Sequence, residues 1–293
     1  MKLTGVLRLP FLILGPACVL PGIATARLAG ATMRWWEILL VLLGAVLAHA
    51  GVNVLNEYHD WKCGLDGKTE RTPFSGGSGT LQSRPELAGA ALILGISATA
   101  AAAGIGLYFV LLGRLLLLAI GGAGVLIVAV YTPWIVRRPL ICLLAPGLGF
   151  GTCIVLGAHL ALGAPLTLAA FLASLIPFFL VNNLLLLNQI PDVEQDRSVG
   201  RSNIIIAYGK KTGLAVYGVF LILCYLVIGL AAAVSLFPVW SLLGLITFPV
   251  AVAAFAGALR HHSRTDRLVP VLGLNVIVVN LTPILTAAGI LIG

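Results

Sequence analysis

Nine long apolar runs take up most of this chain of 293 residues. A membrane-spanning helix needs about 20 mainly apolar residues, and each run approaches or exceeds that length without the alternation of a strand. The runs cover residues 9–30, 36–56, 87–112, 114–133, 139–161, 166–190, 212–236, 239–259 and 268–292. The sequence therefore predicts one all-α domain, residues 1–293, with nine transmembrane helices in a lipid bilayer.

The composition excludes several classes of protein. Hydrophobic residues make up 60% of the chain and charged residues 10%, whereas a soluble domain carries about 25% charged residues. A soluble enzyme, a disordered protein and a secreted disulfide scaffold are therefore excluded. The five cysteines have no paired spacing and four lie in apolar runs, so we expect neither disulfides nor a zinc site.

The basic residues are distributed unequally between the two sets of loops. Fifteen of the 18 Lys and Arg residues fall at the N-terminus or in the loops after the second, fourth, sixth and eighth runs. Because Lys and Arg accumulate in cytoplasmic loops, the N-terminus is predicted in the cytoplasm and the C-terminus outside. This distribution accounts for most of the net charge of +8, and we expect no nucleic-acid partner. Acids contribute little to topology, yet all except Glu37 lie on the cytoplasmic side.

Two acidic motifs lie at the cytoplasmic ends of the second and the sixth run. The first motif, residues 53–66, contains Asn53, Asn56, Glu57, Asp60 and Asp66, and the second motif, residues 188–201, contains Asn188, Asp192, Glu194 and Asp196. Residues three or four apart share a helix face, so each motif directs several oxygen ligands the same way. Their positions four runs apart suggest a diverged internal repeat.

Acids from two motifs would repel each other unless cations lay between them. Mg²⁺ prefers oxygen ligands and is usually bound by one or two carboxylates together with substrate phosphates. Basic residues, the usual phosphate partners, follow both motifs and end the fourth run. Lys62, Arg71, Lys210 and, at the end of the fourth run, Arg137 are candidates, although topology alone would also explain Lys210. The pattern predicts a lipid diphosphate whose head lies at the cytoplasmic mouth and whose tail lies between the helices.

The two motifs resemble those of the UbiA superfamily of intramembrane aromatic prenyltransferases. The first is similar to the family's N-x-x-x-N-D-x-x-D pattern and the second to its D-x-x-x-D pattern. The stretch NQIPDVEQDRSVGRSNIIIAYGKK, residues 188–211, resembles the menaquinone branch, in which D-x-E-x-D-R-x-x-G-K is followed by R-x-G. The chain departs from the family in having Glu57 for Asp, Gly64 where many members have an acid, Arg201 for Lys and Tyr208 for Arg.

The resemblance implies Mg²⁺-dependent transfer of a polyprenyl group from its diphosphate to an aromatic acceptor, at the cytoplasmic face of the cell (inner) membrane. In the menaquinone branch the acceptor is 1,4-dihydroxy-2-naphthoate, which loses its carboxylate. The implied metal ligands are Asn56, Glu57, Asp60, Asp66, Asp192 and Asp196; the implied catalytic residues are Asp60, Asp192, Lys62 and Arg71. The implied substrate-binding residues are Asn53, Lys62, Arg71, Tyr131, Arg137, Asn188 and Lys210.

A dry pocket with aromatic faces would stabilise the prenyl cation. Candidate rings are Tyr58, Phe74, Tyr131, Trp134, Phe150 and Phe178. The loop of residues 71–82, RTPFSGGSGTLQ, is flexible by composition and would serve as a mobile cover that excludes water, or as an ordinary linker.

Three alternatives stay open from the sequence. A member of the same superfamily could use another acceptor, such as hydroxybenzoate, homogentisate, a tetrapyrrole or a glycerol phosphate ether lipid. A transporter also combines repeats with intramembrane polar residues, but its acids should lie near the midplane. A purely structural membrane protein gives no reason for the gathered acids. The sequence does not predict the prenyl length or the oligomeric state.

Overall fold

The computed structural model describes residues 3–65 and 71–293, and within them every regular element is a helix. The long elements are α1 (Leu14–Leu28), α2 (Trp35–Lys62), α4 (Ala88–Leu111), α5 (Leu117–Val130), α6 (Pro139–Gly147), α7 (Val155–Ala161), α8 (Leu168–Asn188), α10 (Ile204–Ala233), α11 (Phe248–His261) and α12 (Thr265–Ile292). Short helices α3 (Thr80–Ser83) and α9 (Val193–Ser198), and the 3-10 turns η1 (Leu3–Leu7), η2 (Leu9–Phe11), η3 (Pro85–Leu87), η4 (Ile135–Arg137) and η6 (Val239–Thr247), connect or extend them.

Seven helices among the described residues are long and apolar enough to cross a membrane. They comprise α2, α8, α10 and α12, together with three composite helices that cover 85–111, 139–161 and 239–261. The segments Leu3–Phe11 and Leu14–Leu28 make an eighth candidate if they form one span bent by 47°. The all-helical membrane architecture is thus confirmed. The structure shows seven or eight candidate spans by length and composition among the described residues, and the ninth span stays a prediction.

The differences from the predicted runs have local causes. The fourth run forms only the 14 residues of α5, about 21 Å at 1.5 Å per residue. Within the fifth run, a π-helical segment, η5 (Leu148–Ile154), separates α6 from α7 and follows Pro146, which cannot donate a helical hydrogen bond. The seventh run begins earlier than expected, at Ile204, because a kink at Gly209 (φ 88°) joins a preceding turn to the long helix.

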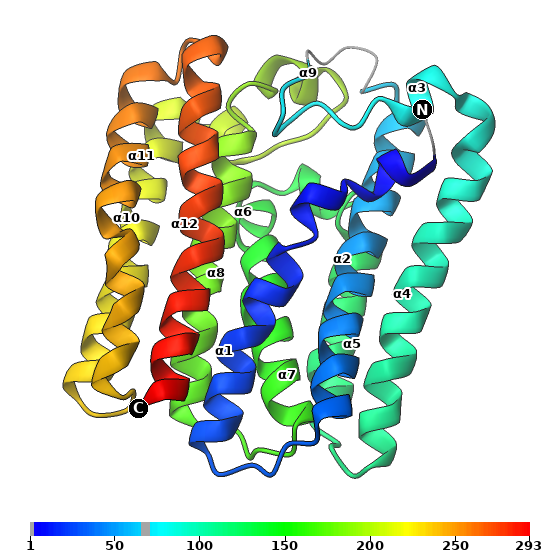
Figure 1. The fold of residues 1–293 in the computed structure, drawn as a ribbon. Coiled ribbons are helices and arrows are strands. Elements are labelled where there is room, and N and C mark those ends of the chain that lie inside the picture. Colours follow the sequence, from blue (N-terminus) through cyan, green and yellow to red (C-terminus); the bar gives the residue numbers. More distant parts are fainter. Residues whose placement is uncertain (1–2, 66–70) are drawn as a thin grey trace.

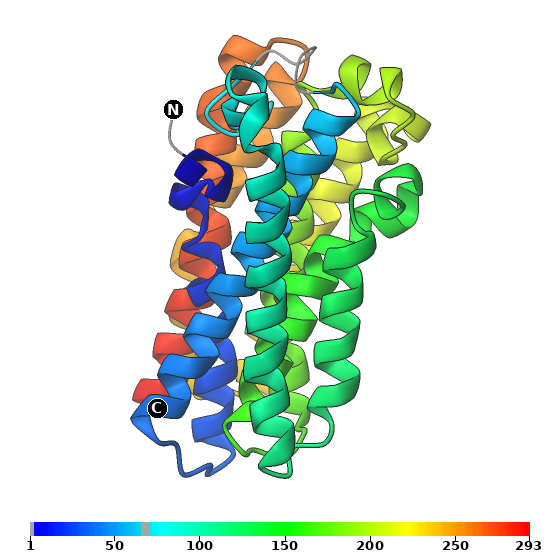
Figure 2. The same cartoon turned by 90° about the vertical axis from the view of Figure 1, so that its right-hand side faces the viewer.

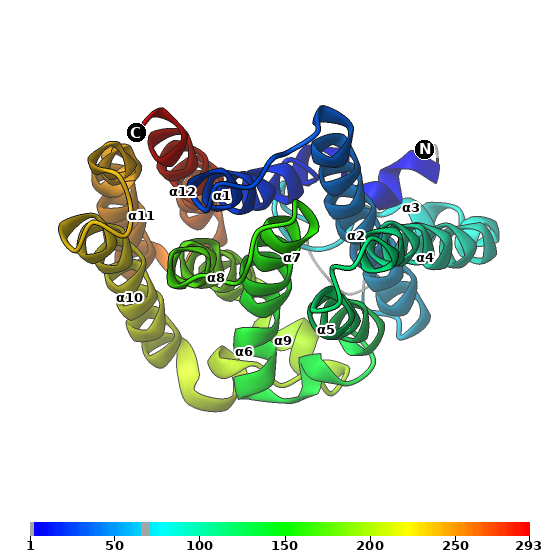
Figure 3. The ribbon, with the colours of Figure 1, turned by 90° about the horizontal axis from the view of Figure 1, so that it is seen from below.

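The helices run roughly parallel to one another, and the two termini lie at opposite ends of the bundle (Figure 1). Figure 2 shows the shorter helix α5 beside α4. Seen along the helix axes, α10 and α11 lie at one end of the cross-section and α4 and α5 at the other (Figure 3). Figure 1 places α9, α3 and the end of α2 together at one end of the bundle, which brings the two acidic motifs to the same end.

Buried polar side chains connect neighbouring helices in the interior. Asn182 accepts a hydrogen bond from the amide of Gly147 (2.6 Å), and Asn183 donates to the carbonyl of Tyr217 (3.0 Å). The Tyr217 hydroxyl donates in turn to Asn275 (3.0 Å). Such bonds stabilise helix association in lipid. The intramembrane asparagines that precede the second motif therefore join helices instead of forming part of the acidic site.

Helices α1 and α7 approach closely at Gly22. A Cβ atom added there would collide with the Val155 carbonyl and the Ala158 side chain, whereas one added at Gly104 on α4 would meet nothing within 4 Å. We expect Gly22→Ala to destabilise the fold by about 1–3 kcal/mol, the usual effect of overpacking. Gly104→Ala should be neutral or stabilising by up to about 1 kcal/mol, because alanine is the better helix former. Thermal unfolding in detergent measures both; equal effects would contradict this packing.

Candidate active site

A cavity of about 660 Å³ extends from the acidic motifs into the bundle. Its charged lining residues come from the end of the molecule that holds both motifs, and they are Arg8, Asp60, Asp192, Asp196 and Arg201. The deeper lining is mostly apolar and comes mainly from α1, α2, α4, α5 and the α6–α7 segment, with a few residues from α8 and α12. The cavity therefore has a charged mouth and an apolar interior.

Arg201 joins the two acidic motifs across the mouth. Its guanidinium forms ion pairs with Asp60 at the end of α2 and with Asp196 on α9, the latter at 3.1 Å between Nη1 and Oδ1. Both carboxylates are 95% buried, and a buried charge needs a partner. Arg201 thus supplies a positive charge between acids that are 136 residues apart in the sequence.

Polar neighbours hold the oxygens of this site in place. Asn56 donates to Asp60 (3.0 Å) while its own carbonyl oxygen accepts from Thr132 (3.0 Å). Asn53 donates to the carbonyl of Leu7 (3.2 Å) and also lines the cavity. Asn188 lines it as well, and its buried Oδ1 has no hydrogen-bond partner. In this structure Asn56 orients Asp60, and Asn188 offers a free oxygen ligand.

Asp192 lies at the start of α9, outside the spanning helices. Burial, and to a smaller extent the nearby Asp196 carboxylate, raises the pKa of Asp192 to about 7. A hydrogen bond with Ser75 and the positive charges of Arg201 and Arg8 lower the pKa and offset part of this rise. Burial also raises the pKa of Asp196. A raised pKa means that the ionised form is destabilised, and a cation placed between these carboxylates would stabilise their ionised forms.

Glu57 is not among the described residues that line the cavity, and its side chain connects three segments. Its carboxylate accepts hydrogen bonds from Arg8 (2.7 Å), from the Ser78 amide (2.8 Å) and from the Ser78 hydroxyl (2.7 Å). The carboxylate is therefore already engaged in hydrogen bonds with other parts of the protein, although the resemblance implies that it binds metal. Glu57 attaches the N-terminal turns and the 71–82 loop to α2, and it fixes Arg8 at the cavity mouth.

We expect Glu57→Gln to weaken this attachment by about 1.5–3 kcal/mol, since it removes charged hydrogen bonds from a buried group. Hydrogen exchange of residues 3–12 and 74–80 should become at least tenfold faster. Glu86→Gln is the matched control, because the Arg84–Glu86 pair is exposed. Unchanged exchange in Glu57→Gln would contradict the role of Glu57.

The structure does not bring the other predicted cations to the cavity. Lys62, Arg71 and Arg137 are exposed, and Arg71 lies near Gln82 (3.4 Å). Lys210 donates to the carbonyl of His262 (3.1 Å), where α11 ends. None of the four lines the described part of the cavity, so their contact with a substrate stays a prediction. Asp66, one of the six implied metal ligands, lies outside the described residues.

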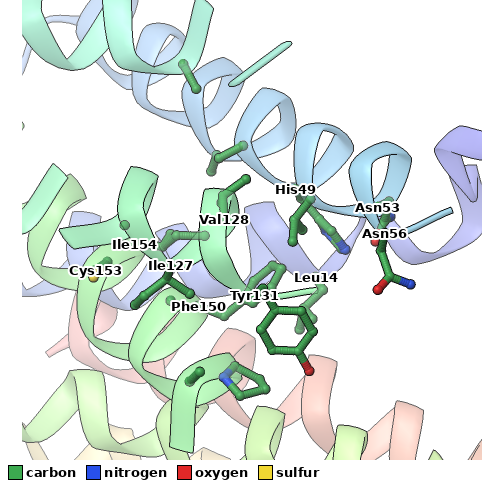
Figure 4. A pocket seen from close by; sticks show the side chains of 18 of the residues that line it. Leu14, His49, Asn53, Asn56, Ile127, Val128, Tyr131, Phe150, Cys153 and Ile154 are labelled. Carbon is green, nitrogen blue, oxygen red and sulfur yellow. The ribbon is translucent and has the colours of Figure 1, made fainter. Parts of the chain in front are cut away.

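Aromatic rings line the cavity below the charged mouth. Of the predicted rings, Tyr131, Phe150 and Phe74 do so, and the described lining does not include Tyr58, Trp134 or Phe178. Figure 4 shows Tyr131 and Phe150 facing the same space as Asn53, Asn56 and a residue that the sequence analysis did not single out, His49.

Sequence reasoning did not assign Arg8 or Arg201 to the site. Arg8 was counted only as a topological charge, and no motif marks the N-terminal segment. Arg201 was noted as one of the basic residues that follow the second motif and as a replacement for Lys, but it was not chosen as a site residue. Its place five residues after Asp196 and just beyond Gly200 (φ 77°) is the only signal that a turn could direct it back to the acids.

Comparison with known proteins agrees with this architecture. A family model described as the UbiA prenyltransferase family matches residues 17–275. The chain belongs to this family. Membership confirms the resemblance and identifies the chain as a prenyltransferase; the menaquinone branch stays a prediction. No curated protein matches the chain significantly.

Solved structures share the fold across the whole chain. A UbiA homologue from Aeropyrum pernix K1, in its apo form, is 17% identical with a TM-score of 0.74, over 96% of this chain and 97% of that one. A digeranylgeranylglyceryl phosphate synthase is 18% identical with a TM-score of 0.64, over 99% and 98%. A UbiA homologue from Archaeoglobus fulgidus bound to DMAPP and Mg²⁺ is 17% identical with a TM-score of 0.62, over 98% and 99%.

Proposed function

We propose that this enzyme transfers a polyprenyl group from an allylic diphosphate to an aromatic quinone precursor, with 1,4-dihydroxy-2-naphthoate as the first candidate. The observation that carries the proposal is the cavity itself: Asp60, Asp192, Asp196 and Arg201 surround the mouth of an otherwise apolar space. A diphosphate fits the charged end and a hydrocarbon tail fits the interior. The Archaeoglobus homologue with DMAPP and Mg²⁺ supports this assignment.

Mg²⁺ fits the residues at the mouth. Asp60, Asp192, Asp196 and Asn188 offer oxygen atoms as ligands, and the Oδ1 of Asn188 is buried without a partner. Within the described residues no group of three or more His, Cys, Asp or Glu side chains is close enough to hold a metal ion, so a ligand set would combine carboxylates with Asn188 and substrate oxygens. When bound, Mg²⁺ would neutralise the charge that develops on the leaving diphosphate.

The residues of the chain would assist each stage. Arg8 and Arg201 offer positive charge to the diphosphate as the allylic C–O bond breaks and its electron pair leaves with the oxygen. Tyr131 and Phe150 present aromatic faces to the resulting cation. The ring carbon that bears the carboxylate then bonds to the allylic carbon, and the carboxylate leaves as CO₂. The 71–82 loop, attached through Glu57 and Ser78, would keep water from capturing the cation.

We further propose nine crossings in the cell membrane, with the N-terminus and the site in the cytoplasm. Termini at opposite ends of the bundle are compatible with an odd number of crossings. The bent first segment and α5 would complete the seven long helices. Fifteen of 18 basic residues belong to the loop set that contains the acidic motifs, as expected for the cytoplasmic side.

A second candidate acceptor is a glycerol phosphate ether lipid, because the chain shares its fold with a digeranylgeranylglyceryl phosphate synthase. The test is product analysis by mass spectrometry with geranylgeranyl diphosphate, Mg²⁺ and one acceptor at a time. We expect a prenylated, decarboxylated naphthalene product from 1,4-dihydroxy-2-naphthoate. A product from geranylgeranylglyceryl phosphate alone would retain the transferase mechanism and overturn the aromatic acceptor.

A further inference from the structure

His49 is a buried polar residue in the apolar part of the cavity. Its side chain is 95% buried, and its Nδ1 has no hydrogen-bond partner. The imidazole packs edge-on against Phe150, with 4.7 Å between ring centroids, and it lines the cavity together with Leu14 (Figure 4). An unpaired buried polar group is costly, which indicates that a partner is supplied when the cavity is filled.

The position of His49 on α2 relates it to the acidic mouth. His49, Asn53, Asn56 and Asp60 follow one another at spacings of four, three and four residues, so they form a polar stripe on one helix face. At 1.5 Å per residue, His49 lies about 10 Å farther into the bundle than Asn56. This depth is below the layer that would hold a diphosphate.

Two of the three available partners do not suit this position. A polyprenyl tail has no hydrogen-bonding group. A buried water needs about 2–4 polar partners, whereas the labelled neighbours of His49 in the close-up are mainly apolar (Figure 4). The remaining candidate is the acceptor, whose ring hydroxyls are hydrogen-bond donors.

A second unpaired group lies at a comparable depth. Asn280 on α12 also lines the cavity, and its Oδ1 is buried without a partner. The start of α12 and the end of α2 lie at the same end of the bundle (Figure 1); these helix ends are Thr265 and Lys62. Asn280 is 15 residues from Thr265 and His49 is 13 from Lys62, so both lie about 20 Å along their helices from that end. No Lys, Arg, Asp or Glu belongs to this deeper part of the described lining, which therefore suits a neutral hydroxyl better than a carboxylate.

We propose that His49 binds the acceptor by accepting a hydrogen bond from one of its hydroxyls at Nδ1. The inference deepens the proposed function and rests on it. It assigns the recognition of the acceptor to α2 and separates it from the diphosphate site at the mouth. The carboxylate of the acceptor would then face the mouth, where Arg8 and Arg201 carry the cavity's positive charge.

The test compares His49→Phe and His49→Asn with the wild type in lipid nanodiscs. Phenylalanine retains an aromatic ring against Phe150 and removes the hydrogen bond, while asparagine keeps a polar atom near the position of Nδ1. Binding of 1,4-dihydroxy-2-naphthoate and of its two monomethyl ethers is measured by titration in the presence of an unreactive thio analogue of the donor. Steady-state KM values for donor and acceptor provide a second readout.

We expect His49→Phe to weaken acceptor binding at least tenfold, with the donor KM within about twofold, since a site built to bind a hydroxyl discriminates strongly against its loss. His49→Asn should recover part of the affinity. One monomethyl ether should bind the wild type at least tenfold more weakly than the free acceptor, and this difference should disappear in His49→Phe. Such a coupled loss identifies a direct contact, which a general effect on folding would not produce.

The results that would overturn the inference differ from those that would overturn the proposed function. If the wild type binds both ethers as tightly as the acceptor, the inference is overturned even if the variants do not fold. If a folded His49→Phe variant binds the acceptor with an affinity within twofold of the wild type, the inference is also overturned. The proposed function is then unaffected. If the wild type fails to release diphosphate with every acceptor that is tested, the proposed function fails and the inference fails with it.

Discussion

Replacing Asp60 or Asp192 with alanine should lower the rate of diphosphate release at least about 1,000-fold, because each substitution removes an oxygen ligand from the charged mouth where the leaving group must be stabilised. Both residues line the cavity and come from different motifs, so neither should compensate for the other. Release of inorganic diphosphate from geranylgeranyl diphosphate, measured at saturating Mg²⁺, gives the rate.

Glu194 provides the matched control for this pair. It lies between Asp192 and Asp196 in the sequence, but its side chain is 76% exposed and pairs only loosely with Arg197 (3.3 Å). Glu194→Ala should keep the rate within about twofold of the wild type, as expected for an exposed ion pair of small energetic value. If the three variants lose activity equally, or if Asp60→Ala retains it, the assignment of the mouth is wrong.

Arg201→Met should have the second-largest effect, on stability as well as on activity. The substitution leaves the buried Asp60 and Asp196 carboxylates facing each other without their shared counter-charge, and breaking a buried ion pair costs about 3–5 kcal/mol. We expect a lower melting temperature in EDTA, a larger rise on adding Mg²⁺ than in the wild type, and a loss of about 100-fold in kcat/KM.

Two further variants make this result specific. Arg201→Lys retains the charge and should recover most of the melting temperature in EDTA. Arg197→Met removes an exposed cation from the same segment and should change neither quantity. An Arg201→Met protein that melts like the wild type in EDTA would contradict the bridging role of Arg201.

Hydrophobic length predicted the helices well because every apolar run must satisfy its own backbone hydrogen bonds in lipid. All nine runs contain helix, and the predicted ends of the runs near Gly113 and Pro238 fall between helices in the structure. Length alone could not show that the first run bends by 47° or that α5 is only 14 residues long. Those features depend on packing against neighbours that are distant in the sequence.

The acidic side chains were easier to place than the basic ones. Asp60, Asp192 and Asp196 converge at one end of the bundle, because the first motif ends the spanning helix α2 and the second follows the end of the spanning helix α8 on the same side. Lys62 is only two residues from Asp60, which on a helix turns it to a different face, and it is exposed. Arg8 and Arg201 reach the mouth from a turn and a connecting loop, whose paths leave no periodic pattern in the sequence.

The central claim is that the two motifs form one site for a prenyl diphosphate. The most direct test is diphosphate release by the purified protein with geranylgeranyl diphosphate and Mg²⁺, with and without 1,4-dihydroxy-2-naphthoate. The account predicts release that depends on the acceptor and is abolished by EDTA. A folded wild-type protein that releases no diphosphate with any donor and acceptor, or that releases it equally in EDTA, would contradict the account.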